Sequence, residues 1–125
     1  MKKKIVLVDD EPDIVKTMEM FLKQEGFNVI TASDGIMALD KIRKEMPDLI
    51  ILDIMLPKLD GYKVCRMLKF DEKYDKIPIV IFTARAQELD KDKAKEVKAD
   101  AYITKPFQPE LLLAKIKELL ERVKT

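Results

Sequence analysis

Leu49-Ile50-Ile51-Leu52-Asp53 places four consecutive apolar residues directly before a carboxylate. A short apolar run of this kind is typical of a buried strand, and the aspartate marks its exit into a loop. Ile5–Val8 has the same character and runs into Asp9 and Asp10. Continuous apolar runs are expected where both faces of a parallel sheet are covered. The two stretches therefore predict buried strands that end in acidic residues.

Outward from these runs, short β-branched segments alternate with longer amphipathic ones. Strands are expected at Ile5–Val8, Asn28–Ala32, Leu49–Leu52, Ile79–Phe82 and Ala101–Thr104. Helices are expected at Pro12–Glu25, Gly35–Lys44, Tyr62–Phe70, Ala86–Val97 and Pro109–Val123. This alternation predicts an α/β fold, in which a doubly wound, five-stranded parallel sheet carries five helices on its two faces. The fourth helix is mostly charged, so we expect it to be the least firmly docked.

Composition restricts the classes of function. The 125 residues make one domain, 1–125, and the net charge of +1 gives no reason to expect contact with nucleic acid or an anionic membrane. No apolar run approaches the roughly 20 residues that span a bilayer. Cys65 is the only cysteine and is expected to be buried; the lack of an internal disulfide suits a cytoplasmic protein. Because histidine is absent, chemistry must rest on carboxylates, hydroxyls, lysine or a hard cation.

Polar residues stand where the predicted strands stop. Asp9 and Asp10 follow the first strand, Asp53 the third, Thr83 the fourth and Lys105 the fifth. Any one of them is most simply the start of a loop. Together they carry more weight, because the carboxyl ends of parallel strands share one edge of the sheet, where α/β proteins form their sites.

This set of residues suits phosphoryl transfer. Crowded carboxylates repel one another, which favours a divalent cation among them, and oxygen ligands suit Mg²⁺. A carboxylate can attack phosphorus and form an aspartyl phosphate. The Lys105 ammonium and the Thr83 hydroxyl would then stabilise phosphoryl oxygens.

Four motifs resemble those of response-regulator receiver domains of the chemotaxis-receiver type, in the family's order and across essentially the whole chain. They are Val8-Asp9-Asp10-Glu11-Pro12, Leu52-Asp53-Ile54-Met55-Leu56-Pro57 with Asp60-Gly61, Phe82-Thr83-Ala84-Arg85, and Tyr102-Ile103-Thr104-Lys105-Pro106-Phe107. The resemblance implies a flavodoxin-like sheet of order 2-1-3-4-5. It also implies a two-component function, in which a phosphohistidine of a sensor histidine kinase or phosphotransfer protein donates its phosphoryl group.

The resemblance assigns the acidic residues their roles. Asp53 is similar to the phosphoacceptor of the family. Asp9 and Asp10 resemble the acidic pair that binds Mg²⁺ together with the phosphoacceptor, and the backbone carbonyl of Met55 matches a further ligand. A receiver of this kind is not a conventional enzyme, although it catalyses its own phosphorylation and dephosphorylation.

The remaining matches concern switching. Lys105 resembles the family's invariant lysine, and Pro106 the proline that follows a cis peptide bond. Thr83 resembles the switch hydroxyl and Tyr102 the switch aromatic, although a half-buried strand aromatic is an equally good interpretation of Tyr102. Switching would alter the surface of the fourth helix, fifth strand and fifth helix, where an output protein or domain docks. A phosphorylation-dependent homodimer is compatible with the resemblance; membrane contact and direct contact with nucleic acid are not expected.

Two positions depart from the family pattern. Lys98 stands where many relatives have the glycine that closes the fourth helix in a left-handed turn, and Ala101 stands where an acidic residue is frequent. Lysine adopts that turn at a cost that glycine avoids, so the end of this helix is expected to be shaped differently.

Three rival classes fit less well. A haloacid-dehalogenase-like phosphatase would need a second aspartate where Met55 stands. A flavodoxin-like electron carrier would need a hydroxyl- and glycine-rich phosphate loop where Asp9 and Asp10 stand. An inactive scaffold with this fold would be expected to lack one or more of the site residues. The chain is expected to be either a single-domain regulator or the receiver of a longer protein.

Overall fold

In the computed structural model, the described residues are 2–83, 91–106 and 108–123. Five parallel strands form one sheet in the order β2-β1-β3-β4-β5, as expected. The strands are β1 (Lys4–Val8), β2 (Asn28–Ala32), β3 (Leu49–Leu52), β4 (Ile79–Thr83) and β5 (Ala101–Thr104). The helices are α1 (Pro12–Gln24), α2 (Gly35–Glu45), α3 (Gly61–Lys69), α4 (Lys91–Glu96) and α5 (Pro109–Val123). The first part of the helix expected over 86–97 lies outside the described residues.

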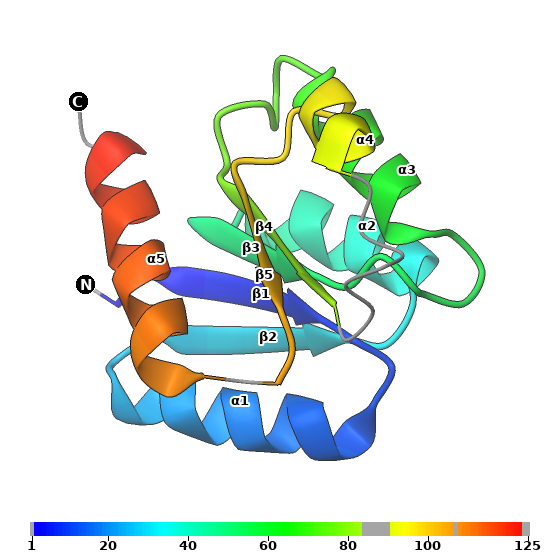
Figure 1. Cartoon of the computed structure of the whole chain (residues 1–125). Coiled ribbons are helices and arrows are strands. Elements are labelled where there is room, and N and C mark those ends of the chain that lie inside the picture. Colours follow the sequence, from blue (N-terminus) through cyan, green and yellow to red (C-terminus); the bar gives the residue numbers. More distant parts are fainter. Residues whose placement is uncertain (1, 84–90, 107, 124–125) are drawn as a thin grey trace.

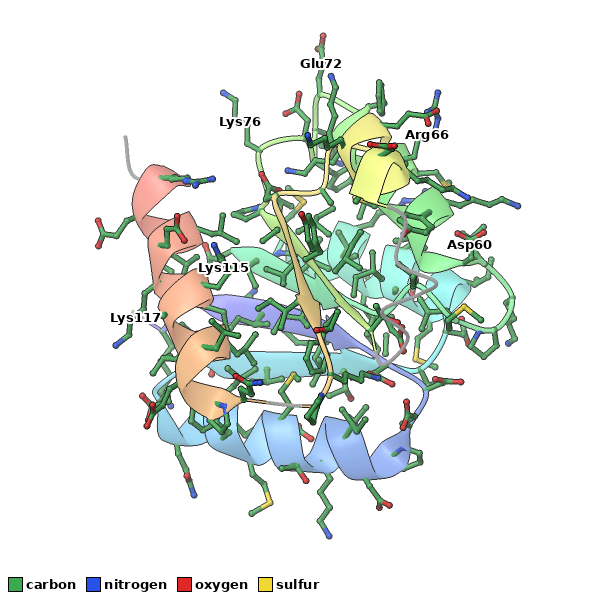
Figure 2. All side chains as sticks on the ribbon, in the orientation of Figure 1. Asp60, Arg66, Glu72, Lys76, Lys115 and Lys117 are labelled. Atoms are coloured by element: carbon green, nitrogen blue, oxygen red, sulfur yellow. The ribbon has the colours of Figure 1, made fainter. Side chains whose placement is uncertain are left out.

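Helices cover both faces of the sheet (Figure 1). One core lies under α1 and α5, and a second lies under α2, α3 and α4. Successive strand residues alternate between the two cores: in β3, for example, Leu49 and Ile51 enter the first, whereas Ile50 and Leu52 enter the second. The apolar runs of the sequence are thus continuous because both of their faces are buried. Charged side chains such as Glu72, Lys76 and Lys117 point away from these layers (Figure 2).

Capping residues begin two of the helices. The Asp34 carboxylate accepts a hydrogen bond from the Met37 backbone N–H at 2.7 Å, and the Asp60 carboxylate accepts one from the Lys63 N–H at 3.0 Å. These bonds satisfy amides that a helix leaves without internal partners. Helix α1 begins with Pro12 behind Glu11, whose side chain makes no capping bond.

The end of α4 corrects the expectation drawn from Lys98. Lys98 adopts the left-handed conformation with φ of +64°. Its N–H donates to the Lys95 carbonyl and the Ala99 N–H to the Ala94 carbonyl, both at 3.0 Å. This is the bond pair with which glycine-terminated helices commonly end. The expectation of a different shape is therefore wrong. Lys98 forms the left-handed turn that glycine usually forms, at the cost of the backbone strain of that conformation.

Polar contacts fasten the same region to α3. The Lys69 ammonium lies 2.6 Å from Asp100 Oδ2, and the Asp100 carboxylate also accepts the Ile79 N–H at 2.8 Å. Cys65 is buried, as expected, and its thiol donates to the Val97 carbonyl at 3.6 Å. Burial raises the pKa of this thiol to about 12, so it stays protonated at neutral pH. Within the described part of the chain, no helix is long and apolar enough to cross a membrane.

Candidate functional site

Two buried carboxylates meet at the carboxyl edge of the sheet. Backbone hydrogen bonds continue the ladder past the strand ends: the Asp9 N–H donates to the Ala32 carbonyl at 3.1 Å and the Asp53 N–H to the Val8 carbonyl at 3.0 Å. Counted over the whole residue, Asp9 is 2% exposed and Asp53 is 4% exposed, whereas Asp10 lies exposed to solvent. The two central strands therefore place both aspartates at one point by their register alone.

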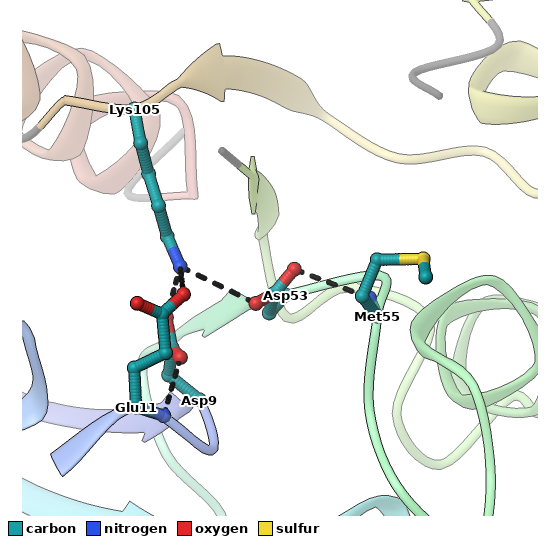
Figure 3. A network of polar contacts seen from close by, with 5 residues as sticks. All are labelled: Asp9, Glu11, Asp53, Met55 and Lys105. Carbon is teal, nitrogen blue, oxygen red and sulfur yellow. Dashed lines mark hydrogen bonds and ion pairs between the residues drawn. The ribbon is translucent and has the colours of Figure 1, made fainter. Parts of the chain in front are cut away.

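Lys105 reaches this point from the end of β5. Its backbone N–H donates to the Thr83 carbonyl at 2.7 Å, and its peptide bond with Pro106 is cis, as expected. Its Nζ lies 2.8 Å from Asp9 Oδ2, 3.1 Å from Glu11 Oε1 and 3.3 Å from Asp53 Oδ2 (Figure 3). The lysine side chain is only 4% exposed, so the ammonium is enclosed by carboxylates rather than by water.

The site residues fit a divalent cation. Asp9, Asp10 and Asp53 each offer a carboxylate oxygen, and these oxygens lie within 4.8 Å of one another. Asp9 Oδ2 is fully buried and accepts no hydrogen bond from the described residues, so its 2.8 Å contact with Lys105 is an ion pair only. A buried oxygen with unused lone pairs, next to two further carboxylates, is the kind of donor set that Mg²⁺ prefers. The Met55 N–H donates to Asp53 Oδ1 at 3.2 Å.

Burial and neighbouring charges together raise the pKa values of both Asp53 and Lys105 above their ordinary values. Burial raises the pKa of Asp53, the N–H of Met55 and the charge of Lys105 act against this, and the charge of Asp9 adds to the rise. Burial also works against the charged form of Lys105, but the contact with Asp9 and the charge of Asp53 outweigh it and raise the pKa of the lysine. A cation that replaced lost hydration would therefore favour the nucleophilic, ionised form of Asp53.

The two predicted switch residues occupy different positions. Thr83 ends β4 and is 1% exposed. Tyr102 lies on β5 and is 40% exposed. Its neighbour Ile103 enters the core under α1 and α5, so strand alternation places Tyr102 on the side of the sheet that α4 covers. The structure thus brings Asp9, Asp10, Asp53 and Lys105 together, with Thr83 at the adjoining strand end and Tyr102 outside this group.

Two neighbours of the site were not predicted. Glu11 forms an ion pair with Lys105, and the only sequence signal was its place directly after Asp9 and Asp10. Gly61 approaches the strand so closely that a Cβ there would overlap the backbone carbonyl of Asp53 and lie 2.7 Å from Ile54 Cα. Its signal was a glycine directly after the capping residue Asp60.

Comparison with known proteins agrees with this geometry. The family model for the response regulator receiver domain matches residues 5–117. The chain belongs to this family. Receiver domains act in two-component systems, with phosphorylation of an aspartate as their general mechanism. The match excludes the phosphatase and electron-carrier readings of the sequence.

Similar proteins include full-length regulators. Over 122 residues the receiver is 48% identical to the alkaline phosphatase synthesis transcriptional regulatory protein PhoP of Bacillus subtilis (strain 168), covering 98% of this chain and 50% of that protein. It is 46% identical over 121 residues to the probable transcriptional regulator ycf27 of Guillardia theta, covering 97% of this chain and 46% of the relative. The chain spans about half the length of the curated relatives it matches.

Solved receiver structures superpose closely. A CheY-like receiver domain protein from Methanospirillum hungatei JF-1 has a TM-score of 0.92 at 31% identity, covering 99% of this chain and 98% of that one. The beryllofluoride-activated receiver domain of Klebsiella pneumoniae RstA has a TM-score of 0.84 at 34% identity, covering 94% and 97%. The receiver domain of sensor histidine kinase PA1611 from Pseudomonas aeruginosa PAO1, which holds a magnesium ion in its active-site cleft, has a TM-score of 0.83 at 29% identity, covering 100% of both chains.

Proposed function

We propose that Asp53 accepts the phosphoryl group in this receiver. The observation that carries the proposal is the burial of the Asp53 carboxylate between the Lys105 ammonium and the carboxylates of Asp9 and Asp10. An Asp53 oxygen would form a bond to phosphorus while the phosphorus–nitrogen bond of a phosphohistidine breaks. The electron pair leaves with the imidazole of the kinase or phosphotransfer protein, and Asp53 becomes an acyl phosphate.

The remaining residues would position the phosphoryl group and neutralise its charge. Asp9, Asp10, Asp53 and the backbone carbonyl of Met55 would hold Mg²⁺, which supplies positive charge for the phosphoryl oxygens. Lys105 would donate a hydrogen bond to one phosphoryl oxygen, because its ammonium already lies 3.3 Å from Asp53. The Thr83 hydroxyl, buried at the neighbouring strand end, would donate to another.

Intact-mass spectrometry tests this assignment. The protein is incubated with acetyl phosphate and Mg²⁺, and a gain of one phosphoryl group is expected. Asp53→Asn should abolish the gain, whereas Asp40→Asn, which removes an exposed carboxylate on α2, should retain it. Chelation of Mg²⁺ should prevent it in every variant. An equal gain in wild type and Asp53→Asn, or a gain that survives chelation, would contradict the proposal.

We further propose that phosphorylation alters the surface formed by α4, β5 and α5, where an output protein, an attached domain or a second copy of the chain would dock. Thr83 would move toward the phosphoryl group, and Tyr102, now 40% exposed, would turn inward. The described part of α4 supports this, because only Ala94 and the adjoining Val97 bury apolar surface there. Phosphorylation can shift this surface only by its differential free energy for the two arrangements, typically about 1–3 kcal/mol.

Backbone NMR with and without beryllofluoride, together with sedimentation of both forms, tests the switch. Chemical-shift changes are expected over 91–104 and 109–123, remote from Asp53. Changes confined to the loops around Asp53 would mean that the site is competent but not coupled to this surface. The proposed setting is the cytoplasm, where a sensor kinase would supply the phosphoryl group.

A further inference from the structure

Glu11 differs from the other described capping residues. Asp34 and Asp60 turn their carboxylates onto the first amides of their own helices, but the Glu11 carboxylate makes no such bond. It reaches instead to the Lys105 ammonium, 94 residues further along the chain, at 3.1 Å. Its backbone N–H meanwhile donates to Asp9 Oδ1 at 3.0 Å (Figure 3). One residue thus contacts both Asp9 and the lysine of the site.

The Lys105 ammonium is already surrounded by carboxylates. It donates hydrogen bonds to Glu11 Oε1 at 3.1 Å and to Asp53 Oδ2 at 3.3 Å, and it forms an ion pair with Asp9 Oδ2 at 2.8 Å. A phosphoryl oxygen on Asp53 would take one of these positions. Two oxygens bound to the same ammonium lie about 5 Å apart. The Glu11 carboxylate would therefore stand close to a phosphoryl group if it kept its contact.

Either outcome at Glu11 opposes the phosphoryl group. If Glu11 stays, its charge repels the phosphoryl oxygens; if it leaves, its ion pair with Lys105 is lost. Leaving is easier for Glu11 than for the other carboxylates, because its side chain is 52% exposed, against 1% for Asp9 and 5% for Asp53. Release of Asp9 from Lys105 would leave a buried charge without a partner, which costs far more free energy than release of the exposed Glu11.

We propose that Glu11 is a positioning residue that holds Lys105 in the unphosphorylated arrangement and weakens the binding of a phosphoryl group at Asp53. The inference rests on the proposed function of Asp53. It follows by linkage that removal of the Glu11 charge strengthens phosphoryl binding, since the ion pair stabilises only the unmodified arrangement. Glutamine keeps an oxygen that can accept from Lys105 but loses the charge, so Glu11→Gln isolates this effect.

Beryllofluoride titration tests the inference, with Mg²⁺ kept saturating for each variant and binding followed by the backbone amides of residues 53–55. Glu11→Gln should lower the apparent dissociation constant about fourfold, the factor expected for one charge about 5 Å away in a water-like medium. Glu25→Gln is the matched control, because it removes an exposed glutamate at the far end of the same helix, and it should leave the constant unchanged.

A second measurement separates positioning from a general effect on the fold. Without metal and beryllofluoride, the ¹⁵N resonance of the Lys105 ammonium should shift in Glu11→Gln and stay unchanged in Glu25→Gln. An unchanged or weaker affinity of Glu11→Gln for beryllofluoride, in a protein whose wild type binds it, would overturn this inference alone. Failure of the wild type to bind beryllofluoride would overturn the proposed function and this inference with it.

Discussion

Substitution of Asp10 by asparagine should stabilise the metal-free protein. The Asp10 carboxylate lies within 4.8 Å of those of Asp9 and Asp53, and Asp10 is the exposed member of the three. At that separation two unit charges repel by about 0.9 kcal/mol in a water-like medium, so the two pairs together contribute about 1.7 kcal/mol before screening. Salt reduces this to about 1 kcal/mol. For a domain of 125 residues, the melting temperature in chelator should rise by about 3–5 °C.

Thermal unfolding by circular dichroism, with chelator and with saturating Mg²⁺, provides the assay. Mg²⁺ should raise the melting temperature of the wild type more than that of Asp10→Asn, because a ligand of the cation has been weakened. Asp13→Asn removes a carboxylate from the first turn of α1, outside the cluster, and serves as the control. It should not gain stability, and its response to Mg²⁺ should match the wild type. A melting temperature for Asp10→Asn at or below that of Asp13→Asn in chelator would refute the reasoning.

Two further predictions concern the surroundings of Asp53. Gly61→Ala should lower the free energy of unfolding, measured in urea titrations, by about 2 kcal/mol or more, and it should slow phosphorylation, because the new Cβ would overlap the Asp53 carbonyl. Lys63→Ala, on the exposed side of the same helix, should have neither effect. Because the pKa of Asp53 is raised, the folded protein binds the proton of this carboxyl more tightly than the unfolded chain does. Proton binding therefore stabilises the fold fully below the pKa of the unfolded chain. This stabilisation is lost as the pH rises through the pKa of the folded protein. In chelator, the melting temperature of Asp53→Asn should therefore increase relative to that of the wild type as the pH rises from 4 to 7. A difference that stays constant with pH would contradict the raised pKa.

The amino-acid sequence by itself determined the elements and their order. Period and length separate strands from helices, because both are set within a few neighbouring residues. The apolar runs Ile5–Val8 and Leu49–Leu52 predicted strands buried on both faces, and the cores on the two sides of the sheet confirm them. The meeting of Asp9 with Asp53 was also predictable, since parallel strands bring their carboxyl ends to one edge.

Tertiary structure decided the contacts that join distant residues. The ion pair of Glu11 with Lys105 and the close approach of Gly61 to Asp53 depend on where side chains and backbones meet in space, and no local period encodes that. The left-handed turn at Lys98 also depends on tertiary structure, and here the local sequence predicted the wrong conformation. Local preference argued against lysine there, but Ala94 and Val97 are buried and Asp100 pairs with Lys69, so the packing on both sides of the turn holds it in place. Side-chain packing, summed over many such contacts, outweighs the backbone preference of a single residue.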